Sequence, residues 1–179
     1  MTRALTSTTT LVLYALAVAG PLQLMSAPAM AQANVAKPVD KIGEWGIYVA
    51  GTGKQKFCYA ATSPKERKPD NLPRDPAYLY IISRPAENVK SEITVVLGFA
   101  AKAGSTAKAE IGSTSFDMTP KGKELWMDNA AKETQMVAAL RKGQKLVLKT
   151  TSQRGNVTTD TYVLSGLDKA LERVAKECQ

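Results

Sequence analysis

Short runs of Val, Ile, Tyr and Phe recur along most of the chain and are separated by glycine, proline and charged residues. Such runs favour β-strands, because branched and aromatic side chains pack well on a pleated surface. The first two runs flank the turn sequence Gly51-Thr52-Gly53-Lys54 and so predict a hairpin. The predicted strands are residues 44–50, 56–62, 77–84, 91–99, 107–111, 115–118, 124–127, 145–151 and 157–164.

Two segments have helical periodicity instead. Asn129 can cap a helix over residues 130–142, and Gly143 stands where that helix would end. Ser165 and Asp168 predict a capping-box-like start for a second helix at the C-terminus. Its apolar stripe recurs at helical spacing and consists of Leu167, Ala170, Leu171, Val174, Ala175 and Cys178.

Many short strands with two helices predict a mainly β fold. We expect an antiparallel β-sandwich-like domain with one internal helix and a C-terminal helix packed against it. The apolar stripe places Cys178 on the buried side of that helix, facing the sheet that should carry Cys58. The chain has two cysteines, which in an oxidising compartment most simply form one disulfide that staples the helix to the sheet. A redox-active pair is the alternative, although such pairs usually lie close together as C-x-x-C.

The connecting segments differ in character. Residues 32–41 are polar and predict a flexible lead-in. Residues 63–76 carry several prolines and charges, which exclude a helix interior or a central strand and predict a surface loop. Ordered loops of this length are unusual and often functional.

The N-terminus has the layout of a secretory signal peptide. Arg3 precedes an apolar run over residues 11–24, and Ala29-Met30-Ala31 supplies a small-x-small cleavage pattern. The run is too short for a membrane-spanning helix. We therefore expect residues 1–31 to be the signal peptide and residues 32–179 to form one exported domain without a transmembrane span.

The composition limits the chemistry. The chain contains 24 Lys and Arg, 16 Asp and Glu and no His. Without histidine, Ser-His-Asp and Cys-His catalysis are excluded and the commonest ligand of transition metals is missing. No dinucleotide-binding or Walker motif occurs, so we expect no nucleotide cofactor. Together with the lack of histidine, this leads us to expect no metal, no cofactor and no enzymatic activity. A carboxylate-based glycan hydrolase stays open as an alternative, with Glu92, Glu110, Asp117 and Asp160 as the acids within strand-like segments.

The net charge of +8 suggests an anionic partner. Basic residues gather in and near the proline-rich loop, at Lys65, Arg67, Lys68 and Arg74. This cluster could engage lipopolysaccharide, another polysaccharide or a host surface, whereas nucleic acid does not suit an exported protein. A solvated basic face is the default interpretation of such a cluster. Trp45 and Trp126 lie in strand-like runs, where core packing is the default role.

Many short motifs occur in a fixed order and spacing along the chain. They are Trp45-Gly46, Phe57-Cys58, Arg74-Asp75-Pro76-Ala77-Tyr78, Ile82-Ser83-Arg84-Pro85, Glu92, Gly98-Phe99, Ile111-Gly112, Phe116, Trp126, the motif S-x-R-G-x-x-T-x-D-T-Y-x-L-x-G over residues 152–166, Ala170 and Cys178. Their order and spacing resemble the invasion-associated locus B family of exported bacterial proteins. The resemblance implies a periplasmic, outer-membrane-associated or secreted protein of a Gram-negative bacterium, without established catalytic residues; some members are linked to host-cell invasion.

The motif over residues 152–166 has two interpretations. In the first, Arg154-Gly155 turns the chain and Asp160 pairs with Arg154 or caps a turn. In the second, Arg154, Asp160 and Tyr162 line a ligand surface with Arg84. The candidate binding surface therefore consists of Lys65, Arg67, Lys68, Arg74, Arg84, Arg154, Asp160 and Tyr162.

These observations favour an exported binding or adhesion-type protein whose partner is an anionic envelope or host-surface component, or an envelope protein. A periplasmic envelope-maintenance or chaperone-like factor is the second hypothesis, and the glycan hydrolase is the third.

Overall fold

Every predicted run of branched and aromatic residues forms a strand, and neighbouring strands pair antiparallel throughout. The computed structural model describes residues 35–179. Two short 3-10 helices, η1 (Gly53–Gln55) and η2 (Pro85–Glu87), lie in connections. The strands are β1 (Lys37–Ile42), β2 (Trp45–Ala50), β3 (Phe57–Thr62), β4 (Glu66–Lys68), β5 (Tyr78–Arg84), β6 (Val89–Val96), β7 (Ala107–Ile111), β8 (Thr114–Lys121), β9 (Glu124–Trp126), β10 (Lys145–Thr151) and β11 (Val157–Val163).

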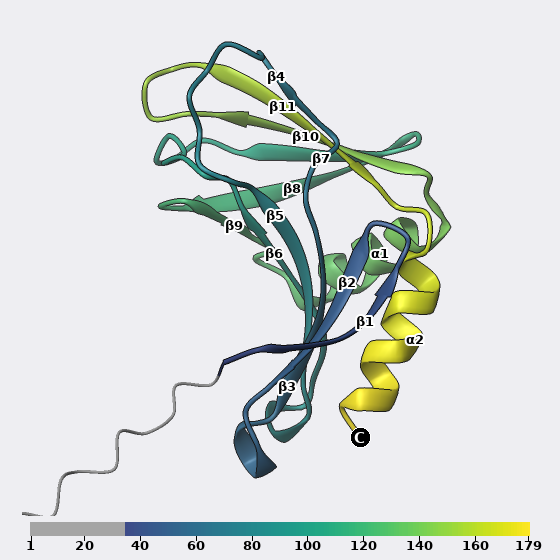
Figure 1. Cartoon of the computed structure of the whole chain (residues 1–179). Helices are drawn as coiled ribbons and strands as arrows, with labels where there is room; N and C mark the ends of the chain where they lie inside the picture. The colour runs from purple at the N-terminus through teal and green to yellow at the C-terminus, as the bar shows by residue number, and fades with distance from the viewer. Residues whose placement is uncertain (1–34) are drawn as a thin grey trace, which may run out of the picture. The chain divides into compact units, whose positions relative to one another are not determined.

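The strands form one continuous sheet that bends at β8. Their order is β1-β2-β3-β5-β6-β9-β8-β7-β10-β11-β4. The first part of β8 pairs with β7, and its last residues, Thr119 to Lys121, pair with β9. The strands on the two sides of this bend run across one another (Figure 1). The predicted β-rich, sandwich-like architecture is thus confirmed.

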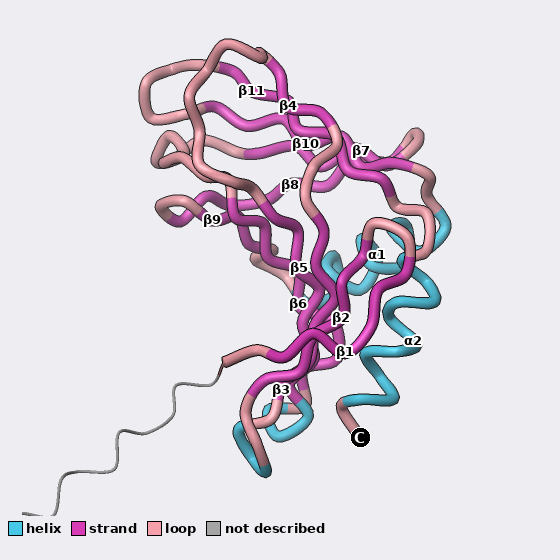
Figure 2. Tube along the Cα trace, viewed as in Figure 1, coloured by secondary structure: helices cyan, strands magenta, loops and turns pink. Residues whose placement is uncertain are grey.

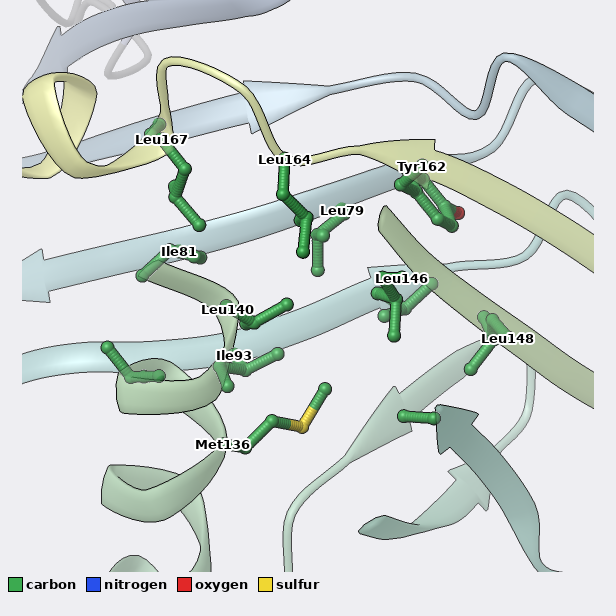
Figure 3. Close-up of a cluster of buried hydrophobic side chains, with 14 of the residues drawn as sticks. Leu79, Ile81, Ile93, Met136, Leu140, Leu146, Leu148, Tyr162, Leu164 and Leu167 are labelled. Carbon is green, nitrogen blue, oxygen red and sulfur yellow. The ribbon is translucent and has the colours of Figure 1, made fainter. Parts of the chain in front are cut away.

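The core lies between the two parts of the sheet and the internal helix. Figure 3 shows Leu79 and Ile93 from the first part beside Leu146 and Tyr162 from the second, with Met136 of the helix below them. All five side chains are fully buried. Inward and outward residues alternate along the strands, which is why the sequence pattern predicted them.

Helix α1 (Ala130–Lys142) has the predicted bounds. The side chain of Asn129 caps it by accepting hydrogen bonds from the backbone N–H groups of Ala131 (2.9 Å) and Lys132 (3.1 Å). Gly143 ends the helix at a close approach, because a Cβ there would lie 2.6 Å from Cγ2 of Ile111. α1 packs against β6 and β8.

Helix α2 (Leu167–Glu177) packs on β1, β2, β3 and β5 and touches α1 (Figure 2, helices in cyan). The predicted stripe is buried except for Ala175, which is exposed. The predicted capping box is wrong: Gly166 occupies the cap position with φ +88°, and no side chain caps the helix. Asp168 instead forms an ion pair with Arg141 at the end of α1.

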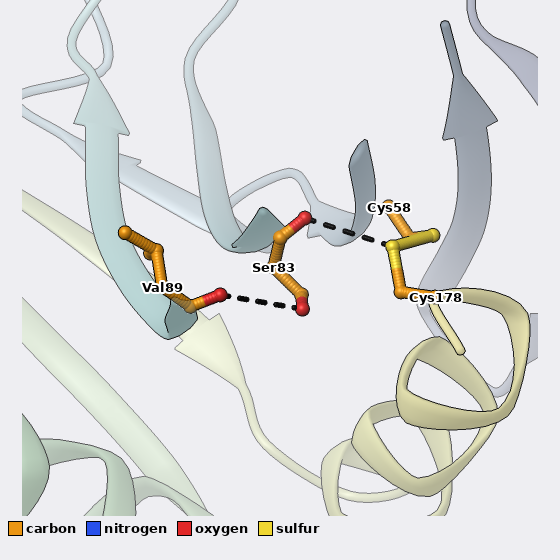
Figure 4. Close-up of a disulfide and its surroundings, with 4 residues drawn as sticks. All are labelled: Cys58, Ser83, Val89 and Cys178. Carbon is orange, nitrogen blue, oxygen red and sulfur yellow. Dashed lines mark hydrogen bonds between the residues drawn. A yellow bond between two sulfur atoms is a disulfide. The ribbon is translucent and has the colours of Figure 1, made fainter. Parts of the chain in front are cut away.

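The predicted disulfide joins the end of α2 to β3. The Cα atoms of Cys58 and Cys178 are 5.8 Å apart, and both residues are buried. Figure 4 shows the bond beside Ser83 of β5, the next strand of the sheet. The C-terminal helix is therefore held covalently to the sheet that it covers.

Of the predictions about connecting segments, the flexible lead-in is wrong, and the surface loop is confirmed except for one short edge strand. The lead-in over 32–41 does not stay irregular, because Lys37–Ile42 forms the edge strand β1 along β2. Nearly all of β1 is exposed on both faces, so its sequence lacks the alternation that reveals a strand. The loop over 63–76 contains the three-residue strand β4 at the opposite edge of the sheet, where a following proline is tolerated.

The two tryptophans differ in burial. Trp45 is fully buried, as predicted, whereas Trp126 is only half-buried. Among residues 35–179 neither helix has the length and hydrophobicity to cross a bilayer. The predicted signal peptide, residues 1–31, lies outside the described residues.

Candidate functional site

A buried ion-pair cluster lies where the proline-rich loop meets β11. Strand β4 pairs with β11 so that Arg67 stands opposite Asp160. The Asp160 side chain is 2 % exposed and accepts hydrogen bonds from Nε of Arg67 (3.2 Å) and Nη1 of Arg74 (3.1 Å). Burial raises the pKa of the Asp160 carboxyl, and the two guanidinium groups oppose that rise. We call Asp160, Arg67 and Arg74 the Asp160 cluster.

The two arginines also fix the loop through backbone carbonyls. Arg67 donates to the carbonyl oxygens of Asp75 and Leu97, both at 2.7 Å, and Arg74 donates to that of Pro69 at 3.0 Å. Arg67 and Arg74 are therefore anchors of the loop. The expectation that they form an open basic patch is corrected, because their donors are already occupied within the fold.

Gly98 supports the same loop from the end of β6. Its φ is +73°, and a Cβ at this position would lie 2.1 Å from the carbonyl oxygen of Asp75. The backbone N–H of Asp75 donates to the carbonyl oxygen of Gly98 at 3.0 Å. This close backbone approach is possible only for glycine.

Two motif residues predicted to line a surface are buried instead. Asp160 pairs with Arg67 and Arg74 and not with Arg154, so the predicted Asp160–Arg154 pair is wrong. Tyr162 is 0 % exposed, and burial raises the pKa of its hydroxyl. Neither side chain is open to a partner, because alternation along β11 turns both toward the interior.

Arg84 lies away from these residues, at the far end of β5. Its guanidinium donates to Glu92 from Nη1 (2.9 Å) and Nη2 (2.5 Å) and to Glu87 from Nε (2.8 Å). The hydrogen bonds to Glu92 raise the pKa of the Arg84 guanidinium. Arg84 thus closes a separate ion-pair group and does not join a surface with Arg154.

The turn after β10 is as predicted, and it presents Arg154. Gly155 has φ +86° and donates to the carbonyl oxygen of Ser152 at 2.8 Å. The Ser152 hydroxyl accepts from the backbone N–H of Asn156 at 3.1 Å. Arg154 at the tip of this turn is exposed, and within residues 35–179 it has no acidic partner.

Arg154 borders a cavity of about 310 Å³ between this turn and the proline-rich loop. We call it the Arg154 cavity. Its basic residues are Arg74, Lys123 and Arg154, and no Asp or Glu of the described chain lines it. Phe99 and Leu72 supply apolar walls, and its remaining lining residues are Pro73, Ala100, Ser152, Gln153, Asn156 and Thr158.

The surroundings of this cavity are positive overall. Nζ of Lys123 lies 3.0 Å from a carboxylate oxygen of Asp75, so that pair is neutral. The Asp160 cluster holds two arginines against one carboxylate, and Arg154 adds a cation. Lys65 and Lys68, the remaining predicted residues, are exposed and pair with Glu44 and Asp70. The cavity is therefore the place where the predicted basic residues leave a net positive charge.

The acids considered for hydrolysis are all paired with basic side chains. Glu110 binds Lys149 at 2.9 Å and Asp117 binds Lys108 at 2.5 Å. Glu92 and Asp160 are held by arginines, as described above. Across residues 35–179 no three acidic or cysteine side chains gather as a metal-binding group.

A second surface was missed by the sequence analysis. Tyr48, Tyr59, Tyr78 and Tyr80 gather on one face of β2, β3 and β5, and their neighbouring ring centroids are 5.0 to 5.8 Å apart. The pair Tyr78 and Tyr80, two residues apart in one strand, was the visible signal. Tyr48 and Tyr59 join them only through the register of the sheet. We call this the tyrosine face.

Comparison with known proteins identifies the fold. No protein-family model and no curated protein sequence matches the chain. Among solved structures, the crystal structure of invasion-associated protein B from Bartonella henselae matches with a TM-score of 0.55 and 17 % identity, over 80 % of this chain and 97 % of that one. The chain therefore has an invasion-associated protein B-like fold, as its sequence motifs predicted.

Proposed function

We propose that this protein is an exported, non-enzymatic binding protein of the Gram-negative envelope that recognises an anionic group in the Arg154 cavity. The observation that carries the proposal is Arg154 itself, an exposed guanidinium without an acidic partner in residues 35–179, at the mouth of a cavity with no acidic lining. A guanidinium in this setting suits a phosphate or carboxylate group on a glycan.

The disulfide and the predicted signal peptide support export. A disulfide that closes a long loop persists in the periplasm or outside the cell, and is rare in the cytosol. We propose that the protein is exported to the periplasm. From there it either associates with the outer membrane or is secreted. A contribution to host-cell contact or invasion would follow if the bound glycan belongs to a host surface.

Replacing Arg154 by Ala is expected to weaken binding of purified lipopolysaccharide about tenfold or more, because a charge-assisted hydrogen bond is lost. Isothermal titration calorimetry measures this, with dephosphorylated lipopolysaccharide as the ligand control. Lys132→Ala, an exposed charge on α1, is the matched protein control because it lowers the net charge equally. Equal binding by the Arg154 and Lys132 variants would refute a site in the cavity.

Neutralising the whole loop would not test binding. A variant that replaces Lys65, Arg67, Lys68 and Arg74 together also removes both partners of Asp160. Loss of binding in that variant would report loss of the loop structure.

Fractionation of the native bacterium tests the proposed location. We expect the protein on the outer membrane or in the medium, and we expect washing with high salt to release it, because screening weakens an electrostatic attachment. Recovery only as soluble periplasmic protein, unaffected by salt, would instead favour the envelope-maintenance role.

A further inference from the structure

The tyrosine face lies on the side of the sheet that no helix of residues 35–179 covers. Cys58 of β3 is bonded to the end of α2, so its neighbours Phe57 and Tyr59 point to the opposite face. The register places Tyr48 opposite Tyr59, and Gly46 opposite Ala61. Three adjacent strands therefore present aromatic rings around a floor of two small residues.

The rings support one another. Tyr48 and Tyr59 are stacked at 5.0 Å, and Tyr59 and Tyr80 meet edge to face at 5.6 Å. Tyr78 lies 5.8 Å from Tyr80, and its side chain is 36 % exposed. Such contacts fix the rings in place, so the face is ordered before any ligand arrives.

Gly46 is needed for this arrangement. A Cβ at Gly46 would lie 2.7 Å from Cε2 and 2.8 Å from the hydroxyl oxygen of Tyr48. The Tyr48 ring therefore lies over the glycine backbone, where a side chain at position 46 would displace it.

The face is hollowed and almost free of charge. A shallow depression of about 410 Å³ is lined by the four tyrosines and by Gly46, Ala61, Thr62 and Ser63, and only Lys41 and Glu44 of its lining residues are charged. This volume falls within the usual range of small-molecule sites. In a chain of net charge +8 this lining carries one basic and one acidic side chain, Lys41 and Glu44, so its charge favours neither an anion nor a cation.

The tyrosine hydroxyls are free for a ligand. Within residues 35–179 the hydroxyls of Tyr48, Tyr59, Tyr78 and Tyr80 make no hydrogen bond that the structure records. Burial raises the pKa of Tyr59 and Tyr80, so both stay protonated and can donate as well as accept.

We infer that the tyrosine face binds a neutral oligosaccharide whose pyranose rings carry equatorial hydroxyls. Such a ring has flat C–H faces, which suit the electron-rich faces of aromatic rings, and a polar edge, which suits the tyrosine and serine hydroxyls. The two sets of lining residues share no member, so this site is separate from the Arg154 cavity and does not rest on the proposed function.

The test is a titration of the labelled protein, residues 32–179, followed by ¹H–¹⁵N NMR. The probes are cellotriose, triacetylchitotriose and maltotriose, with choline chloride as the cationic probe. We expect amide shifts that are confined to β2, β3 and β5. At least one trisaccharide should bind with a dissociation constant of about 1 mM, which suits a shallow site. Tyr78→Ala and Gly46→Ala should each weaken it about tenfold, the first by removing a ring and the second by displacing Tyr48.

Two control variants leave the tyrosine face intact. Val157→Ala removes an exposed apolar side chain from β11 and should bind normally, as should Lys132→Ala, which removes an exposed charge from α1. Absence of shifts with all three trisaccharides would overturn the inference. Shifts with choline alone, or shifts of the same amides on diluting the protein without sugar, would also overturn it, because they assign the face to a cation or to a second copy of the chain.

Discussion

Reduction of the Cys58–Cys178 disulfide is expected to lower the free energy of unfolding by about 4–5 kcal/mol, since the bond closes a loop of 120 residues. A loop of this length gives the unfolded chain much freedom once the bond is cut. The same bond holds the end of α2 against β3, so reduction should also expose that end of the helix. Urea denaturation with and without dithiothreitol measures the change.

The matched control for reduction is the double variant Cys58→Ala/Cys178→Ala. Alanine is chosen because both positions are buried and a serine hydroxyl would lack a partner. The variant should have the reduced protein's stability, and dithiothreitol should have no effect on it. An unchanged urea midpoint after reduction of the wild type would show that the sheet and helix hold without the bond.

Asp160→Ala is expected to lower the free energy of unfolding by about 3–5 kcal/mol, because it leaves two guanidinium groups without their shared counter-charge. Arg74 is almost as buried as Asp160, with its side chain 6 % exposed. The loop over residues 63–76 should then loosen. Hydrogen exchange at the amides of Lys65 and Asp75, which bond to the carbonyl oxygens of Thr161 and Gly98, reports this directly.

Two further variants calibrate this result. Asp160→Asn keeps one acceptor oxygen and should cost about 1–3 kcal/mol. Asp117→Ala removes an exposed ion pair with Lys108 and should cost less than about 1 kcal/mol. Equal costs for Asp160→Ala and Asp117→Ala would contradict a structural role for the Asp160 cluster.

The sequence predicted most of the fold because burial follows local pattern. In β5 the buried Leu79 and Ile81 alternate with Tyr78 and Tyr80, a period that any strand with one buried face must have. β1 escaped prediction because an edge strand exposed on both faces has no such period. The cap of α2 was wrong because Ser165 and Asp168 match a capping pattern, whereas the chain turns through Gly166 instead.

The candidate site was harder to predict, since its contacts are distant in sequence. The basic composition of the loop was visible, but Arg67 meets Asp160 across 93 positions and so changes from a free cation into an anchor. Arg154 lies in a turn that was predicted correctly. Of the eight residues predicted to form the binding surface, only Arg154 is both exposed and without an ion-pair partner in the described chain. The tyrosine face needed the register between β2 and β3, which no local pattern contains.

The pairing of β4 with β11 also determines when this chain can fold. Residues 66–68 are synthesised early, yet their partners in β11 follow more than ninety positions later. The separation between Cys58 and Cys178 is larger still, at 120 positions. A chain that emerges N-terminus first cannot complete these contacts until β11 and Cys178 have emerged. Folding is thereby delayed until these later segments are available, and such long-range pairing is intrinsically slow. During that interval the edges of the strands that have already formed stay open to aggregation, and a chain of this topology would benefit from a holding chaperone.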